Sequence, residues 1–372
     1  MHLPEIKDLH GESAPVSHYS VGSARTQLGA VVSSVTRSGT VDVDNRATMS
    51  PSADRDLARR AQRMAVLSEL RYPTTRLAKV FSGLLALILF GIVSIATISG
   101  FLLFQILKPP RTPAAFDLNV MMGHPTTFSF PSSDGTQREG WFFPGLRGAP
   151  TVIVSHGYLS QRADVLTLAA ALQEHEFNAF VFDYAGHGSS PGVTTLGYRE
   201  AGELRAAVQA LAKRDDIDPK RFGLWGVDLG AYASLDVASS DPRIAAFAVD
   251  SVYDSPRNLL QIEVKRSGLG ALPFVSRFCG FAFSILNYQY RQQSPISTHL
   301  GITRGVPKLF LGADDKPILE DKTTQIFAKA PDPKQMAREH VSYRDMSDED
   351  RRSYENQIVN FFAQYIPPTA QR

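Results

Sequence analysis

The residues most suited to chemistry lie in the stretch RFGLWGVDLGAYASL, residues 221–235. Gly226, Asp228 and Gly230 have the spacing of a turn in which a sharp strand-to-helix bend exposes the middle side chain as a nucleophile. We call Gly226–Gly230 the elbow. Serine is the usual middle residue, but Asp228 takes its place here. A carboxylate can attack a carbon atom and form an ester. Asp228 is therefore either an unusual nucleophile or the replacement of a serine nucleophile that has been lost.

An acid and then a histidine are expected after such a nucleophile. In the hydrolases that the motifs described below resemble, a Gly-x-x-Asp pattern carries the acid, which implies Asp315 at the end of FLGADD as the candidate, with Asp314 as the adjacent alternative. The histidine is expected at Met346–Asp348, but no histidine follows position 340. His340 is the remaining candidate. Residues 339–345 are predicted to form a strand, which places His340 several residues too early for a hydrogen bond to the site.

The elements that must carry these residues follow from an alternation of apolar runs and segments of helical period. The predicted strands are 126–130, 138–143, 151–155, 178–186, 221–228, 244–252, 306–315 and 339–345. The predicted helices are 163–176, 197–214, 230–239, 318–330 and a last helix that ends near 366. Alternating units of this kind predict an α/β fold with a doubly wound, mostly parallel sheet.

Three motifs at successive strand ends resemble those of the alpha/beta-hydrolase superfamily, especially its dienelactone-hydrolase and prolyl-oligopeptidase-like serine hydrolases. The motifs are His156-Gly157, DYAGHGSSPG at 183–192 and the elbow. The resemblance covers residues 125–366 and implies an alpha/beta-hydrolase fold with a helical cap at about 254–300. It also implies that the backbone N–H groups of Tyr158 and Leu229 form an oxyanion hole, and that His156 and Gly157 belong to the binding loop.

The sequence departs from this superfamily at two catalytic positions. Related dehalogenases and epoxide hydrolases use an Asp nucleophile that Trp usually follows, but Leu229 follows here, which favours serine-hydrolase ancestry. Because the histidine base is missing, standard Ser-His-Asp chemistry is not expected, and we predict a degenerate hydrolase that retains a ligand-binding pocket. The alternatives are an active hydrolase that uses Asp228 on an ester, haloacid or epoxide, and a membrane-tethered scaffold. Asp228 and Asp315 would repel each other, and Arg344 is the predicted cation between them.

A long apolar segment predicts attachment to a membrane. Residues 81–107 carry no charge over 27 positions, whereas a helix needs about 20 apolar residues to cross a bilayer. The predicted segments are a disordered polar tail (1–53), a basic juxtamembrane helix (54–79), a transmembrane helix (80–108), a linker (109–124) and, after the hydrolase domain, a short tail (367–372). Lys and Arg are more numerous before the span than after it. This bias predicts a cytoplasmic N-terminus and a hydrolase domain outside the cytoplasmic (inner) membrane.

Composition narrows the expected partners. A formal net charge of +2 gives no indication of nucleic-acid binding. The single cysteine, Cys279, excludes a disulfide framework and a Cys-rich zinc site, and no metal or cofactor is predicted. The expected partners are the lipid bilayer and a small-molecule ester or acyl ligand. The cap is expected to pack over the pocket; the alternative is a lid that leans on lipid through Phe274, Phe278, Phe281 and Phe283.

Overall fold

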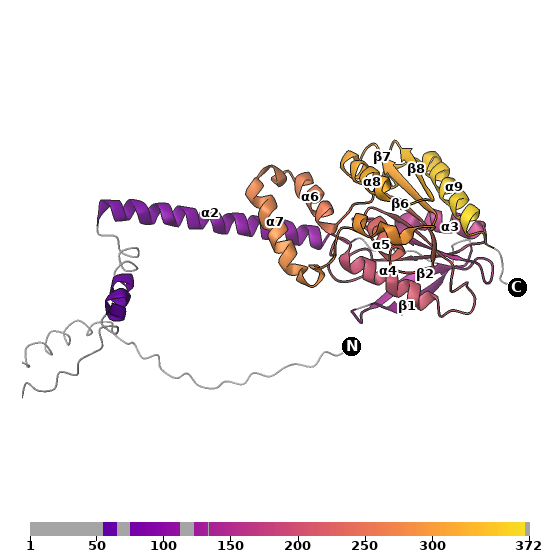
Figure 1. Cartoon of the computed structure of the whole chain (residues 1–372), viewed down its shortest axis with the longest axis horizontal. Helices are drawn as coiled ribbons and strands as arrows, with labels where there is room; N and C mark the ends of the chain where they lie inside the picture. The colour runs from indigo at the N-terminus through magenta and orange to yellow at the C-terminus, as the bar shows by residue number, and fades with distance from the viewer. Residues whose placement is uncertain (1–54, 65–74, 112–122, 133, 369–372) are drawn as a thin grey trace, which may run out of the picture. The chain divides into compact units, whose positions relative to one another are not determined.

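The computed structural model describes residues 55–64, 75–111, 123–132 and 134–368, and Figure 1 shows their helices and strands along the chain. The chain divides into two compact units, residues 1–83 and 84–372. In the first unit, residues 55–64 are helical, within the predicted juxtamembrane helix. The predicted polar tail (1–53), most of the predicted linker and the final four residues lie outside the described residues.

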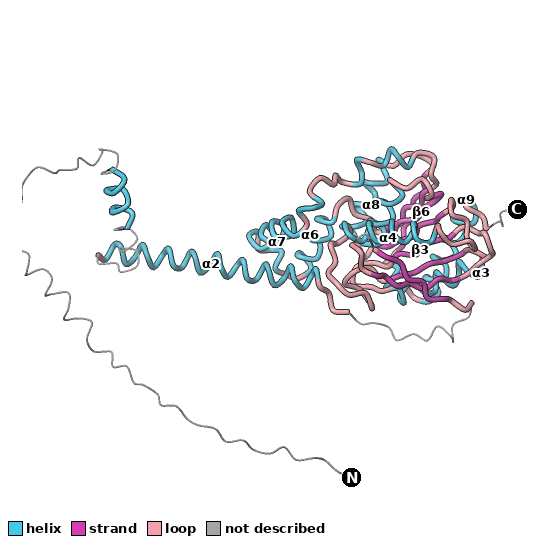
Figure 2. The backbone as a smooth tube through the Cα atoms, turned by 90° about the horizontal axis from the view of Figure 1, so that it is seen from below, coloured by secondary structure: helices cyan, strands magenta, loops and turns pink. Residues whose placement is uncertain are grey.

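The second unit is built on an eight-stranded sheet with the strand order β1-β2-β4-β3-β5-β6-β7-β8. Figure 2 shows the strands of this sheet in magenta with helices around them. The strands are β1 (Thr126–Pro131), β2 (Gln137–Phe143), β3 (Thr151–Ser155), β4 (Asn178–Phe182), β5 (Phe222–Val227), β6 (Ile244–Asp250), β7 (Lys308–Ala313) and β8 (Lys334–Glu339). The pairs β1–β2 and β2–β4 are antiparallel, and the other pairs are parallel. β3, β4, β5 and β7 are buried along their whole length, as expected of parallel strands covered on both faces.

Helices cover both faces of this sheet. One buried apolar cluster contains side chains of α4, α5 and α8, and a second cluster contains those of α3 and α9. The helices outside the cap are α2 (Arg76–Leu107), α3 (Leu166–Glu174), α4 (Tyr198–Leu211), α5 (Leu229–Ala238), α8 (Pro317–Lys329) and α9 (Asp348–Tyr365). This arrangement confirms the predicted doubly wound, mostly parallel α/β sheet.

The last strand lies earlier in the sequence than predicted. The predicted strand at 339–345 is wrong, because β8 is Lys334–Glu339 and a 3-10 turn occupies Tyr343–Asp345. β8 is an edge strand that pairs only with β7, so its residues, KQMARE, are polar and half exposed and lack the apolar run of an inner strand. His340 therefore follows the strand directly.

A helical cap is inserted between β6 and β7, as predicted. Its longer helices are α6 (Pro256–Arg266) and α7 (Pro273–Leu286), and 3-10 turns follow them. α6 and α7 pack against each other, and Val264, Val275 and Phe283 join the same buried cluster as α4 and α5. The cap is therefore part of the domain core.

Among the described residues, α2 is the one helix that is long and apolar enough to cross a membrane, with a mean hydropathy of 2.5 over an 18-residue window. Its last turns pack into the hydrolase domain, where Leu103 and Ile106 are buried. The Tyr158 hydroxyl donates to the Ile106 carbonyl at 2.9 Å, and the Thr194 N–H donates to the Leu107 carbonyl at 2.9 Å. The last carbonyls of a helix have no partner within the helix, so these bonds cap α2 and join it to the domain.

Candidate active site

Asp228 lies at the sharp turn between β5 and α5. Its backbone has φ 37° and ψ −95°, outside the regions that L-residues ordinarily occupy. Gly226 and Gly230 permit the turn, because a Cβ at Gly226 would overlap the Gly230 backbone and a Cβ at Gly230 would overlap the carbonyl of Ser155. The strand, the helix and the loop after β3 are thus pressed together around one strained residue, as the elbow spacing predicted.

The Asp228 carboxylate accepts hydrogen bonds from the two backbone N–H groups that were predicted to form an oxyanion hole. The Tyr158 N–H donates to Asp228 Oδ1 at 2.6 Å, and the Leu229 N–H donates to the same oxygen. The carboxylate also lies against Gly157, where a Cβ would come within 2.8 Å of Oδ2. The side chain therefore fills the place where the oxygen of a tetrahedral intermediate would be held.

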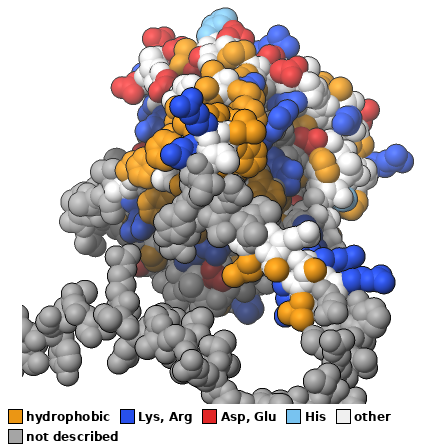
Figure 3. Space-filling model, turned by 90° about the vertical axis from the view of Figure 1, so that its left-hand side faces the viewer, with side chains coloured by type: hydrophobic (Ala, Val, Ile, Leu, Met, Phe, Trp, Pro, Cys, Tyr) orange, Lys and Arg blue, Asp and Glu red, His pale blue; other side chains and the backbone are white. Residues whose placement is uncertain are grey.

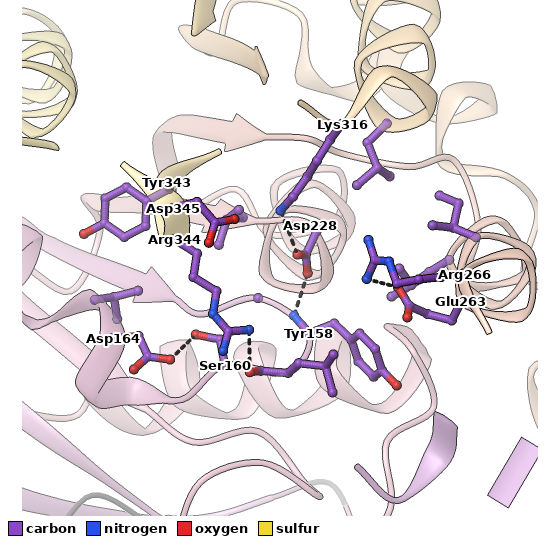
Figure 4. A pocket seen from close by; sticks show the side chains of 17 residues that line it. Tyr158, Ser160, Asp164, Asp228, Glu263, Arg266, Lys316, Tyr343, Arg344 and Asp345 are labelled. Atoms are coloured by element: carbon purple, nitrogen blue, oxygen red, sulfur yellow. Dashed lines mark hydrogen bonds and ion pairs between the residues drawn. The ribbon is translucent and has the colours of Figure 1, made fainter. Parts of the chain in front are cut away.

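The cation beside Asp228 is Lys316, not the predicted Arg344. Lys316 Nζ lies 4.0 Å from Asp228 Oδ2, whereas Arg344 donates to the Leu159 carbonyl at 3.0 Å on another wall of the same cavity. Lys316 extends toward Asp228 from the start of α8 (Figure 4). The predicted repulsion between Asp228 and Asp315 has no counterpart here, because Asp315 is exposed, accepts a bond from a serine hydroxyl and does not line this cavity.

Two buried histidines, His156 and His187, lie near the elbow and have structural partners. His156 Nδ1 lies 2.8 Å from the Gly157 carbonyl oxygen, and the Tyr184 N–H donates to its Nε2 at 3.1 Å. Backbone groups thus engage both ring nitrogens of His156, and neither is free to act as a base. His187 contacts the Ala185 carbonyl through Nδ1, and burial lowers the pKa of His187 to about 3.

The loop after β8 brings other side chains to the cavity. His340 has a 99% exposed side chain, and its Nδ1 lies 3.1 Å from Asp314 Oδ2 at the surface. Neither residue lines the cavity, whereas Tyr343, Arg344 and Asp345 do. Among the described residues, this cavity has no histidine in its lining.

The cavity next to the elbow has a volume of about 230 Å³. The sequence predicted that the cap packs over the pocket but did not identify the residues of α6 that form this wall, which are Leu259, Ile262, Glu263 and Arg266. Glu263 pairs with Arg266 at 2.8 Å. Burial raises the pKa of Glu263, and the negative charge of Asp228 raises it further. Glu263 and Lys316 carried no motif of their own, so only the position of the cap and of α8 identifies them.

These groups determine what the site can do. A substrate carbonyl cannot use the two N–H groups while Asp228 Oδ1 accepts from both of them. The second carboxylate oxygen faces Lys316 and the cavity, so one negatively charged oxygen stays available to a ligand. The described residues contain no cluster of three His, Cys, Asp or Glu side chains that could hold a metal ion.

Comparison with known proteins places the chain in a family. The profile of the alpha/beta hydrolase family matches residues 151–354. The chain belongs to this family. It is 27% identical over 254 residues to the uncharacterized protein YfhR of Escherichia coli K12, covering 64% of this chain and 81% of YfhR.

Two solved structures are similar in fold. The esterase Pf2001 of Pyrococcus furiosus has a TM-score of 0.56 at 17% identity, covering 70% of this chain and 98% of the esterase. The alpha/beta hydrolase GrgF of Penicillium sp. sh18 has a TM-score of 0.52 at 19% identity, covering 65% of this chain and 99% of GrgF. At these identities the likeness concerns the fold alone, and the chemistry must be argued from the site.

Proposed function

We propose that this protein is a membrane-anchored member of the alpha/beta hydrolase family that has given up serine-hydrolase chemistry and binds a small ester or acyl ligand in the cavity beside the elbow. In this proposal α2 crosses the cytoplasmic membrane with the N-terminus on the cytoplasmic side, and the hydrolase domain lies outside. The apolar length of α2 and the basic residues that precede it support this orientation.

One observation carries the proposal: the carboxylate of Asp228 accepts both N–H groups of the oxyanion hole. A serine hydrolase needs those donors for the developing oxyanion and a base for its nucleophile. The Asp228 carboxylate itself occupies the two N–H donors, so they are not available to an oxyanion. Among the described residues, the cavity lining contains no histidine that could act as the base. The cavity itself persists, with apolar walls from α6 and charged groups at its base, which is the composition of a ligand site.

A second candidate function has its own support. Asp228 Oδ2 accepts no backbone N–H among the hydrogen bonds of the described residues and faces the cavity. It could therefore attack a saturated carbon of a haloacid and displace the halide ion, or attack an epoxide carbon and open the ring to an alkoxide that takes a proton from water. Glu263, whose pKa is raised by burial, could then take a proton from the water that cleaves the resulting ester. In this candidate Asp228 is a nucleophile and Glu263 replaces the missing histidine.

Turnover in ¹⁸O-water separates the two functions. The full-length protein, Asp228→Asn and Asp228→Ser are incubated with a panel of esters, haloacids and epoxides. We expect no turnover by the wild-type chain and none by Asp228→Ser, because the serine would lack a base. Turnover that Asp228→Asn abolishes, with ¹⁸O in the carboxylate of Asp228 by peptide mass spectrometry, would overturn the proposal in favour of the nucleophile.

Ligand binding is tested with methyl octanoate. We expect it to raise the thermal unfolding midpoint of the wild-type protein, because a ligand that binds only the folded state stabilises that state. In Ile262→Trp, where the indole fills the cavity, we expect no shift. Partitioning of methyl octanoate into the detergent affects both proteins equally. An equal shift of the unfolding midpoint in wild type and Ile262→Trp would therefore contradict binding in this cavity.

A further inference from the structure

Helix α7 of the cap has apolar side chains on two faces. Val275, Cys279 and Phe283 are buried in the core. A second set repeats at spacings of four, three and four residues, so its members share one face of the helix. These exposed side chains, with their exposed fractions, are Phe274 (63%), Phe278 (37%), Phe281 (63%) and Ile285 (57%). We call these four residues the outer stripe. An exposed row of aromatic residues on a soluble domain marks an interaction surface.

The outer stripe belongs to a helix that packs directly against α2. The thiol of Cys279 donates to the Ser99 carbonyl at 3.4 Å, and α7 lies beside the second half of α2 in both ribbon views (Figures 1 and 2). α2 exposes its own apolar side chains on either side of this contact, at Ile98 and Phe101. Both helices therefore expose apolar side chains at the level of their contact.

The contact lies at the depth where a bilayer would end. At a rise of 1.5 Å per residue, the twenty helical residues before Ser99 span about 30 Å, which is the thickness of the hydrocarbon core. The residues of α2 beyond Ser99 then lie outside that core, where Leu103, Ile106 and Leu107 pack against the domain. α7, with 14 residues, is too short to cross a bilayer, but it lies at the right level to rest in the interface.

The charge of the cap fits the same surface. Residues 264–313 contain no Asp or Glu and six Lys and Arg residues. Five of these cations are exposed: Lys265, Arg266, Arg277, Arg291 and Arg304. Figure 3, seen from the left-hand side of Figure 1, shows a broad area of hydrophobic side chains with Lys and Arg at its margins. Apolar residues flanked by cations are typical of helices that lie in the headgroup region of anionic membranes.

We propose that α7 is an interfacial membrane helix, which inserts the outer stripe into the acyl-chain boundary and directs the neighbouring cations to anionic headgroups. The inference rests on the membrane anchoring proposed above and extends it from one helix to two. α6, which packs on α7, also forms a wall of the elbow cavity. The cap would thus hold the ligand cavity against the membrane, where an acyl ligand is most concentrated.

Lipid-attached quenchers test this placement. Because Cys279 is the only cysteine, Cys279→Ser gives a cysteine-free chain whose hydroxyl can still donate to Ser99. Single cysteines are then placed at Phe281 on α7, at Leu87 on α2 and at Ser353 on α9, all exposed positions. Each is labelled with NBD in full-length protein reconstituted into vesicles of phosphatidylcholine and phosphatidylglycerol that contain nitroxide-labelled lipid.

We expect quenching at Phe281→Cys of at least half that at Leu87→Cys, and none at Ser353→Cys. Quenching at Leu87→Cys but not at Phe281→Cys would overturn the interfacial helix while leaving the anchoring intact. Absence of quenching at Leu87→Cys would overturn the anchoring itself, and the inference with it. A disulfide-linked dimer through Phe281→Cys, without lipid quenching, would assign the outer stripe to a second copy of the chain and also refute the proposal.

Discussion

Replacing Asp228 should destabilise the hydrolase domain, because its carboxylate satisfies two backbone donors at the tightest turn of the fold. In Asp228→Ala, the N–H groups of Tyr158 and Leu229 lose their acceptor. A hydrogen bond to a charged acceptor contributes about 1.5–3 kcal/mol. Water in the cavity can partly replace the carboxylate, so we expect the free energy of unfolding to fall by about 2–4 kcal/mol for the two bonds together.

Asp228→Asn provides the matched comparison. Its amide oxygen can accept both N–H groups, and only the charge is lost, so we expect a cost of about 1 kcal/mol. Loss of the repulsion between Asp228 and Glu263 offsets part of this cost. Asp315→Ala removes another carboxylate, one that is exposed and accepts from a serine hydroxyl, and it should cost less than about 1 kcal/mol.

Urea unfolding of the full-length protein in detergent micelles measures these differences. The two tryptophans of the chain, Trp141 and Trp225, are both buried in the hydrolase domain, so their fluorescence reports the unfolding of that domain. The expected order of stability is wild type, then Asn, then Ala. Equal stability of Asp228→Ala and wild type would refute the argument, because the two N–H groups would then not depend on the carboxylate and would be open to an oxyanion.

Three further changes test how the domain is held together. Tyr158→Phe leaves the buried Ile106 carbonyl without its donor, so it should lower the free energy of unfolding by about 1–2 kcal/mol in the same urea assay. Leu103→Ala should lower it by about 2–4 kcal/mol, because Leu103 is 3% exposed, whereas the 54% exposed Phe104→Ala should have little effect; equal effects would place the end of α2 outside the core. Burial lowers the pKa of His187 to about 3 from 6.5, so the unfolded chain alone binds this proton as the pH falls from 6.5 toward 3. His187 should therefore contribute a loss of stability of about 1.4 kcal/mol for each pH unit of acidification in that window, and the stability of His187→Phe should fall less steeply by that amount in unfolding curves measured across it.

The inner part of the sheet was predictable because burial on both faces leaves a strong signal. β3, β5 and β6 are nearly unbroken apolar runs, and the elbow glycines punctuate the turn that follows β5. The edge strand β8 was misplaced for the opposite reason. Its residues are all exposed or half-buried, so the apolar residues after it gave the stronger but misleading pattern. That error also displaced His340 relative to the strand.

The backbone groups of the site could be predicted from the sequence. The side chains that reach the site from distant helices and loops could not. The N–H donors of Tyr158 and Leu229 follow from local turns, so the motifs indicated them. Lys316 and Glu263 come from the start of α8 and from the cap, and no local pattern links either of them to the elbow. The choice of Lys316 over Arg344 as the cation depends on where the loops after β7 and β8 lie in space.

The sequence by itself determined the α/β class, the apolar helix that precedes it, the elbow with Asp228 and the lack of any histidine after position 340. These properties are local, since periodicity, glycine spacing and residue identity act over a few positions along the chain. Only the tertiary structure decided that the Asp228 carboxylate accepts the N–H groups of Tyr158 and Leu229, that His340 pairs with Asp314 at the surface, and that α7 packs on α2 at Ser99. Each of these depends on side chains that are far apart in sequence, and packing alone brings them together.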